Sequence, residues 1–158
     1  MALFQRILCP VDFSETSMKA FTYADRLARE SGAELVLVHA FEMPASYDPA
    51  GQYEPADQSL RERLEAATPA TPAANVTRLM HAGPPGEVIC WFASDQECDL
   101  IVMGTHGRGG LMHLLLGSVA EYVIRYAPCP VITIRDRPAK ERPLTEPRVE
   151  PLPPPHML

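Results

Sequence analysis

The chain has 158 residues, of which 46% are hydrophobic, and its formal net charge at pH 7 is −6. This length suits one domain with a full core. The acidic balance, with Lys19 and Lys140 as the only lysines, argues against a basic nucleic-acid-binding face. No apolar run approaches the ~20 residues of a membrane span, and the N-terminus lacks a signal-peptide pattern. We therefore expect a cytoplasmic protein that binds neither nucleic acid nor membrane.

The first half of the chain alternates between strand and helix patterns. Residues 6–11 form an apolar run that predicts a strand, and Ser14 is a good N-cap for a helix that ends at Gly32. Residues 34–40 are apolar on consecutive positions, as in a strand that is buried on both faces. A polar loop over residues 43–56 leads to a short predicted helix over 57–67, with Leu60 and Leu64 on one face.

The alternation continues in the second half. Residues 75–81 predict a third strand, and Pro85 begins a helix that precedes the apolar strand 100–103. A last helix begins at Ser118, with Val119, Val123 and Ile124 expected to point inward, and residues 131–134 form a fifth strand.

Five strands that alternate with four helices predict an α/β fold, a single doubly wound domain whose parallel sheet is covered on both faces. We assign this domain to residues 1–135. Residues 136–158 include seven prolines, and their charges cancel. This proline-rich C-terminal tail cannot form a core of its own, so we expect it to be disordered or laid along the domain surface. A role as a PxxP ligand is the less favoured alternative.

The cysteines and two histidines do not suggest a metal site. The four cysteines are scattered without a C-x-x-C pair, which favours buried small side chains in a reducing compartment. His39 and His81 end the second and third strands without the spacing of metal ligands, so we interpret them as polar strand ends. The four cysteines are Cys9, Cys90, Cys98 and Cys129.

Residues 104–118 carry the most informative pattern, a glycine-rich loop between a buried strand and a helix start. Glycine lets the backbone approach a ligand closely, and the N–H groups of the first helical turn face an anion there. A Walker A loop does not fit, because Gly110 stands where the lysine is required. The Rossmann fingerprint fails as well, because Met112 replaces its last glycine.

The spacing that fits is G-x2-G-x9-G-[ST], formed by Gly104, Gly107, Gly117 and Ser118. With this pattern the chain resembles the ATP-binding branch of the universal stress protein family. The segments 10–14 and 130–132 strengthen the resemblance, which covers roughly residues 4–135. It implies the strand order 3-2-1-4-5, in which Asp12 and Gly104 meet at the topological switch point where open α/β sheets bind ligands.

The resemblance also implies the residues of a nucleotide site. Asp12 would accept from an adenine amine or a ribose hydroxyl, although it can also cap the helix that Ser14 begins. Met103 and Ala40 would contribute backbone atoms, and Arg108 or His106 could reach a terminal phosphate. A side chain at position 117 would block the phosphates. We expect the start of the helix to tolerate that side chain structurally. The implied cofactor-binding residues are Pro10, Val11, Asp12, Ala40, Met103, Gly104, Gly107, Arg108, Gly117, Ser118 and Val119.

The resemblance thus predicts a regulatory stress-response protein that binds ATP, or ADP or AMP, with Mg²⁺ or Mn²⁺ held by the phosphates if at all. Little or no turnover is expected, because the loop has no lysine and no second acidic residue beside it; Glu121 is expected at the surface. The alternatives are a slow ATPase or phosphotransferase using His106 or Asp12, and a dimeric interaction module that binds no nucleotide.

A homodimer is also expected. In the implied order the fifth strand lies at an edge of the sheet, and an uncovered apolar edge invites pairing with a second copy. The strand consists of Val131, Ile132, Thr133 and Ile134.

Overall fold

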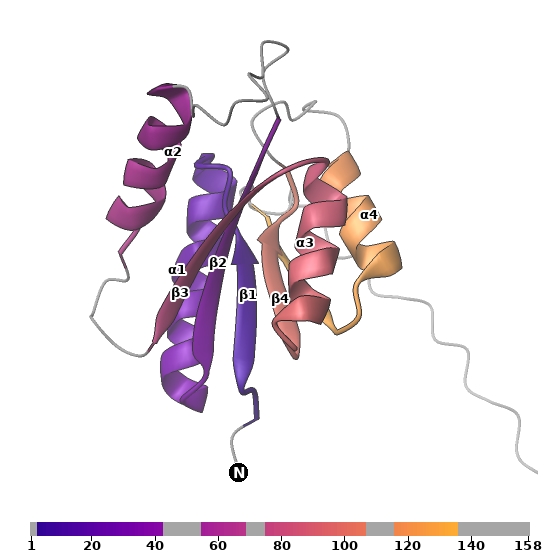
Figure 1. Cartoon of the computed structure of the whole chain (residues 1–158). Coiled ribbons are helices and arrows are strands. Elements are labelled where there is room, and N and C mark those ends of the chain that lie inside the picture. The colour runs from indigo at the N-terminus through magenta and orange to yellow at the C-terminus, as the bar shows by residue number, and fades with distance from the viewer. Residues whose placement is uncertain (1–2, 43–54, 69–74, 107–115, 136–158) are drawn as a thin grey trace, which may run out of the picture.

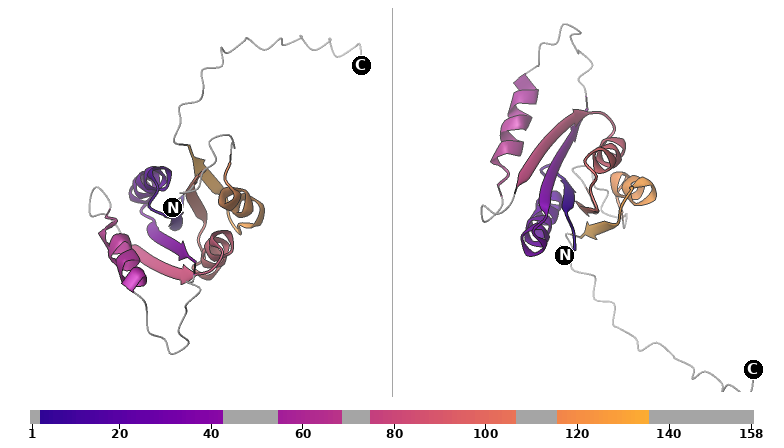
Figure 2. Two further views of the ribbon diagram at one scale, coloured as in Figure 1. Left: turned by 90° about the horizontal axis from the view of Figure 1, so that it is seen from above. Right: turned by 60° about the horizontal axis from the view of Figure 1, so that its bottom comes forward.

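The computed structural model describes residues 3–42, 55–68, 75–106 and 116–135. Within them the chain forms a five-stranded sheet of order β3-β2-β1-β4-β5 in which all neighbouring strands are parallel. The predicted fold and strand order are therefore confirmed. Figure 1 shows the sheet with α1 and α2 on one side and α3 and α4 on the other, and both views of Figure 2 keep this arrangement. The C-terminal tail, residues 136–158, lies outside the described residues.

The elements match the expected ones to within two residues at each end. They run in the order β1 Arg6–Pro10, α1 Glu15–Ser31, β2 Glu34–Phe41, α2 Pro55–Ala66, β3 Val76–Ala82, α3 Pro85–Asp95, β4 Leu100–Gly104, α4 Ser118–Tyr126 and β5 Val131–Ile134.

The ends of α1 follow the expected capping chemistry. Ser14 has an extended backbone, and its hydroxyl accepts a hydrogen bond from the N–H of Ser17 at 3.2 Å. At the other end Gly32 adopts the left-handed conformation, with φ 71°, and its N–H donates to the carbonyl of Ala28. These two caps place the N-terminus of α1 directly after β1, at the carboxyl edge of the sheet.

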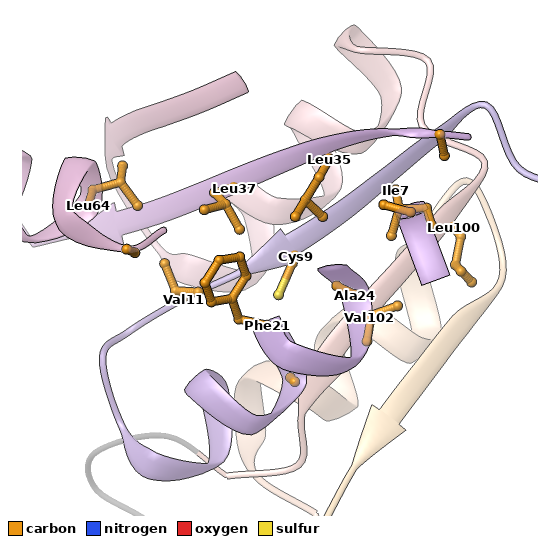
Figure 3. Packing of buried hydrophobic residues seen from close by; sticks show 14 residues of the cluster. Ile7, Cys9, Val11, Phe21, Ala24, Leu35, Leu37, Leu64, Leu100 and Val102 are labelled. Atoms are coloured by element: carbon orange, nitrogen blue, oxygen red, sulfur yellow. The ribbon is translucent and has the colours of Figure 1, made fainter. Parts of the chain in front are cut away.

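Two apolar clusters cover the two faces of the sheet. The alternating residues of the central strands divide between them, because successive side chains of a strand point to opposite faces. Figure 3 shows the first cluster, in which Phe21 and Ala24 of α1 pack against Cys9, Leu37 and Val102 of the sheet. Leu8, Val36 and Ile101 face the other way and pack with residues of α3 and α4.

One packing expectation is wrong. Val123 of α4 is fully buried, and Val119 is half-buried, but Ile124 is 50% exposed. The inward face of this short helix is formed by Ala120 and Val123, three residues apart. Ile124 follows Val123 directly and therefore points away from the sheet.

The cysteines are buried or half-buried and free, as expected. Burial raises the pKa of the Cys9 thiol and, as the main cause, raises the pKa of Cys98 to about 12. No helix in the described part of the chain is both long and apolar enough to cross a membrane.

Candidate functional site

A cleft of about 840 Å³ opens at the carboxyl edge of the sheet, between the ends of β1 and β4. It lies at the topological switch point, where the chain leaves β1 toward one face of the sheet and β4 toward the other. Nine of the eleven residues predicted for the site line it: Pro10, Val11, Asp12, Ala40, Met103, Gly104, Gly117, Ser118 and Val119. The other two, Gly107 and Arg108, lie outside the described residues.

Backbone groups of β2 face the cleft at one end. The N–H of Val11 donates to the carbonyl of Val38 at 2.8 Å, so Val38 presents its peptide groups to β1. In a parallel ladder every second residue faces the same neighbour, so Ala40 also faces that side. Because β1 ends at Pro10, the Ala40 peptide groups look into the space beyond it. The alternation therefore turns the carbonyl and N–H of Ala40 toward the cleft, which Ala40 lines.

The backbone of Met103 does not face the cleft, although the resemblance implied that it would contribute backbone atoms there. The N–H of Ile101 donates to the carbonyl of Pro130 at 3.0 Å, and that of Thr105 donates to Ile134 at 2.9 Å. Met103 lies between them in the same alternation, so its peptide groups face β5 and not the cleft. The backbone that β4 turns toward the cleft belongs to Gly104.

Both glycines of the motif that the structure describes are also needed for packing. A Cβ atom on Gly104 would lie 2.9 Å from Cγ2 of Thr16 and 3.3 Å from the backbone nitrogen of Ser17, at the start of α1. One on Gly117 would lie 3.0 Å from the backbone oxygen of Thr105. A side chain at 117 would therefore be in tight contact with the backbone of Thr105, which would have to shift by a few tenths of an ångström to accept it.

The N-terminus of α4 gives one end of the cleft a partial positive charge. Gly117 is its N-cap and has no side chain with which to accept from the first turn, in contrast to Ser14 on α1. Ser118, Val119 and Ala120, which form that turn, all line the cleft. Their N–H groups carry the positive end of the helix dipole, which attracts an anion such as phosphate. Glu121 is exposed, as expected.

Asp12 has a local structural role as well as a place in the cleft. Its Oδ1 accepts from the N–H of Ser14 at 2.9 Å, and its own N–H donates to the hydroxyl of Ser17 at 3.3 Å. The carboxylate therefore stabilises the turn that begins α1, and it lines the cleft at the same time.

The two strand-end histidines differ. His81 is exposed, packs its ring against Trp91 and fits the interpretation as a polar strand end. His39 is only 5% exposed, lines the cleft, and its Nδ1 lies 2.7 Å from the carbonyl of Val11. The sequence reasoning missed His39 as a site residue, although its place one residue before Ala40 was a usable signal. His106 also lines the cleft, with its Nδ1 at 3.0 Å from the hydroxyl of Thr105.

The described residues hold no cluster of three or more His, Cys, Asp or Glu side chains that could bind a metal ion. Within this part of the chain, the cleft therefore offers an anion-binding helix end at one side and open peptide groups at the other. This arrangement suits an elongated ligand with a phosphate group and a planar hydrogen-bonding group.

The chain is similar to known proteins over most of its length. The model of the universal stress protein family matches residues 3–135. A universal stress protein of Methanocaldococcus jannaschii is 35% identical over 147 residues, which cover 88% of this chain and 86% of that protein. The structure of the universal stress protein UspA from Lactobacillus plantarum matches with a TM-score of 0.70 at 31% identity, covering 85% of this chain and all of that one. A universal stress protein in complex with cAMP matches with a TM-score of 0.63 at 28% identity, covering 85% and 98% of the two chains.

Proposed function

Because the chain belongs to the universal stress protein family, we propose that it is a regulatory stress-response protein that holds ATP, or ADP or AMP, in the cleft between β1 and β4. The observation that carries the proposal is the uncapped N-terminus of α4, whose first turn lines this cleft. The cAMP complex of a related protein supports an adenine nucleotide as the ligand.

In this proposal the two ends of the cleft bind different parts of the nucleotide. The peptide groups of Ala40 and the Asp12 carboxylate bind the base and ribose, which present both donors and acceptors. The N–H groups of Ser118 and Val119, with the Ser118 hydroxyl, bind phosphate oxygens. Gly107 and Arg108, outside the described residues, belong to the same proposed site. A divalent ion such as Mg²⁺ or Mn²⁺ would be held by the phosphates.

We further propose that turnover is too slow to be the function. Fast phosphoryl transfer requires a positioned nucleophile and strong charge neutralisation. His106 and Asp12 line the cleft, but each already has a hydrogen-bonded neighbour, Thr105 and Ser14 respectively. Steady-state phosphate release at saturating ATP tests this. A kcat near the enzyme median of about 10 s⁻¹ would establish the ATPase alternative instead.

The binding proposal is tested by Ser118→Asp, with Ser118→Asn as the matched neutral control. Ser118 is exposed at the first position of α4, where an acidic residue is compatible with the helix dipole. The carboxylate would lie beside the phosphates, and we expect about a tenfold weaker ATP affinity from the charge repulsion. The asparagine variant should lose much less, and added salt should reduce the difference between the two.

Calorimetric titration with ATP measures all three proteins, and thermal unfolding checks that each variant is folded. Equal ATP affinity in the aspartate and asparagine variants would remove α4 from the phosphate site.

A further inference from the structure

Three side chains from three separate elements meet beside the cleft. Phe13 follows β1, His39 lies on β2 and Arg63 lies on α2. The rings of Phe13 and His39 have centroids 4.8 Å apart, and Cζ of Arg63 lies over the Phe13 ring at 4.3 Å from its centroid. The second distance is that of a cation–π contact. We call these three residues the Phe13 cluster.

Phe13 has an unusual backbone conformation. Its φ is +64°, in the left-handed region that a bulky residue rarely enters. Such a conformation is costly and persists only where its surroundings hold it. The contacts of the ring with His39 and Arg63 are positioned to do this.

The residues before Phe13 are held on two sides. His39, which contacts the Phe13 ring, also lies with its Nδ1 at 2.7 Å from the carbonyl of Val11. The Asp12 carboxylate accepts from the N–H of Ser14 at 2.9 Å. Val11, Asp12 and His39 all line the cleft. The backbone conformation at Phe13 therefore affects the position of this side of the cleft.

The helix α2 reaches the same place from the other side. Leu60 lines the cleft, and Arg63, three residues later, contacts Phe13. Leu64 is only 3% exposed and belongs to the core cluster under α1. Positions 60, 63 and 64 share one helix face, so the face that docks α2 on the core also carries its contacts with the cleft and with Phe13.

The C-terminal end of α2 is fastened to the sheet by Arg78 of β3. Its Nε donates to the carbonyl of Leu64 at 3.0 Å, and Nη2 donates to that of Ala67 at 2.9 Å. Arg63 lies in the same last turn, so loss of its contact with Phe13 would remove one tie between α2 and this side of the cleft while the bonds from Arg78 keep the helix docked.

We propose that Phe13, His39 and Arg63 are positioning residues that link the docking of α2 to the affinity of the cleft for a nucleotide. The inference rests on the proposed function. Linkage is reciprocal: a bound nucleotide stabilises the docked α2, and a partner that draws α2 away weakens nucleotide binding. The device thus gives a regulatory protein a way to report its nucleotide state on its surface.

The test uses AMP, which carries the base and ribose that Asp12 would contact. Phe13→Gly removes the ring and accepts positive φ, and we expect about a tenfold loss of AMP affinity from the unfixed turn. Arg63→Met removes the cation but keeps an aliphatic side chain, with about a threefold loss expected for an exposed cation–π contact. Phe13→Tyr should retain wild-type affinity. Arg61→Met, an exposed arginine of the same helix, is the matched control and should also retain it.

A second readout needs no nucleotide. The amide hydrogen of Ser14 and the amides of residues 60–66 should exchange faster in ligand-free Phe13→Gly than in the wild type, because the turn and α2 lose a common support. Wild-type AMP binding with unchanged affinity in Phe13→Gly and Arg63→Met would overturn the linkage and leave the proposed function standing. If the wild type bound neither AMP nor ATP, the proposed function would fail. The linkage to nucleotide affinity would fail with it, and the exchange experiment would then test only the coupling between the turn and α2: faster exchange in the variant would support this coupling, and unchanged exchange would refute it.

Discussion

At Gly104, the last residue of β4, the first turn of α1 comes within contact distance of the position that a Cβ atom would take. The same residue turns its peptide groups toward the cleft. A glycine there meets two requirements at once: it lets α1 pack closely on the sheet, and it leaves the ligand side of the backbone open. The sequence motif shows the need for glycine but does not separate the two causes.

We predict that Gly104→Ala destabilises the protein by about 1–3 kcal/mol, since the added methyl group overpacks a tight contact. The contacts are Cγ2 of Thr16 at 2.9 Å and its backbone carbon at 3.2 Å. Adding Thr16→Ser removes Cγ2 and should recover part of the loss, but the backbone contact remains. Urea unfolding of the single and double variants measures both effects. Wild-type stability in Gly104→Ala would show that close packing is not the reason for this glycine.

The thiol of Cys98 is expected to make the free energy of unfolding depend on pH in the alkaline range. Burial, as the first cause, raises its pKa from 9.0 to about 12. The folded state therefore keeps a proton that the unfolded chain releases, so the contribution of this thiol is complete below pH 9 and is lost as the pH rises toward 12. We expect the free energy of unfolding to fall across this interval, and to fall less steeply in Cys98→Ala. Parallel slopes for the two proteins would show that Cys98 does not contribute.

At the scale of elements, β5 is one of the two edge strands of the sheet, opposite β3. In its register with β4, the carbonyls of Pro130 and Ile134 face β4, and the alternation places the N–H of Ile132 on that side as well. The N–H groups of Val131 and Thr133 therefore face the open edge. The side chain of Ile132 is 39% exposed and adds apolar surface to this strand.

We propose that two copies pair through this edge of β5 as a homodimer. The variant that tests it is Thr133→Pro, which removes an N–H group from the open edge; proline is tolerated at an edge strand. Ile132→Pro would instead break the ladder with β4 and serves as the contrasting variant. Light scattering at micromolar concentration should show that the wild type is a dimer. The Thr133→Pro variant should remain folded, and its measured mass should shift toward that of a monomer. A monomeric wild type would contradict the dimer.

Most of the elements could be predicted because their signals are local. Ser14 and Gly32 mark the ends of α1, and the consecutive apolar residues of β2 and β4 predict strands that are covered on both faces. The outward position of Ile124 could not be predicted, because α4 is only nine residues long and its periodicity tolerates more than one phase. Which N–H groups of β5 face β4, and which face the open edge, depends on the register of the two strands. The sequence alone does not determine this register.

At the scale of the whole molecule, the site arises from segments far apart in the chain. The glycine motif and Asp12 could be found in sequence because each follows a strand, and the strand order brings them together. His39 and Leu60 could not be assigned to the lining of the cleft in this way, although the position of His39 one residue before Ala40 gave a partial signal. Their place depends on tertiary packing, on the turn at Phe13 in one case and on the docking of α2 in the other.

The proposed function depends above all on an adenine nucleotide in the cleft between β1 and β4. The most direct measurement is to denature the purified full-length chain, identify the released small molecules by mass, and titrate the emptied, refolded protein with ATP. We predict that an adenine nucleotide is released, or that added ATP binds at one site per chain. If no nucleotide is released and the correctly refolded protein does not bind ATP at millimolar concentration, the proposed function is contradicted.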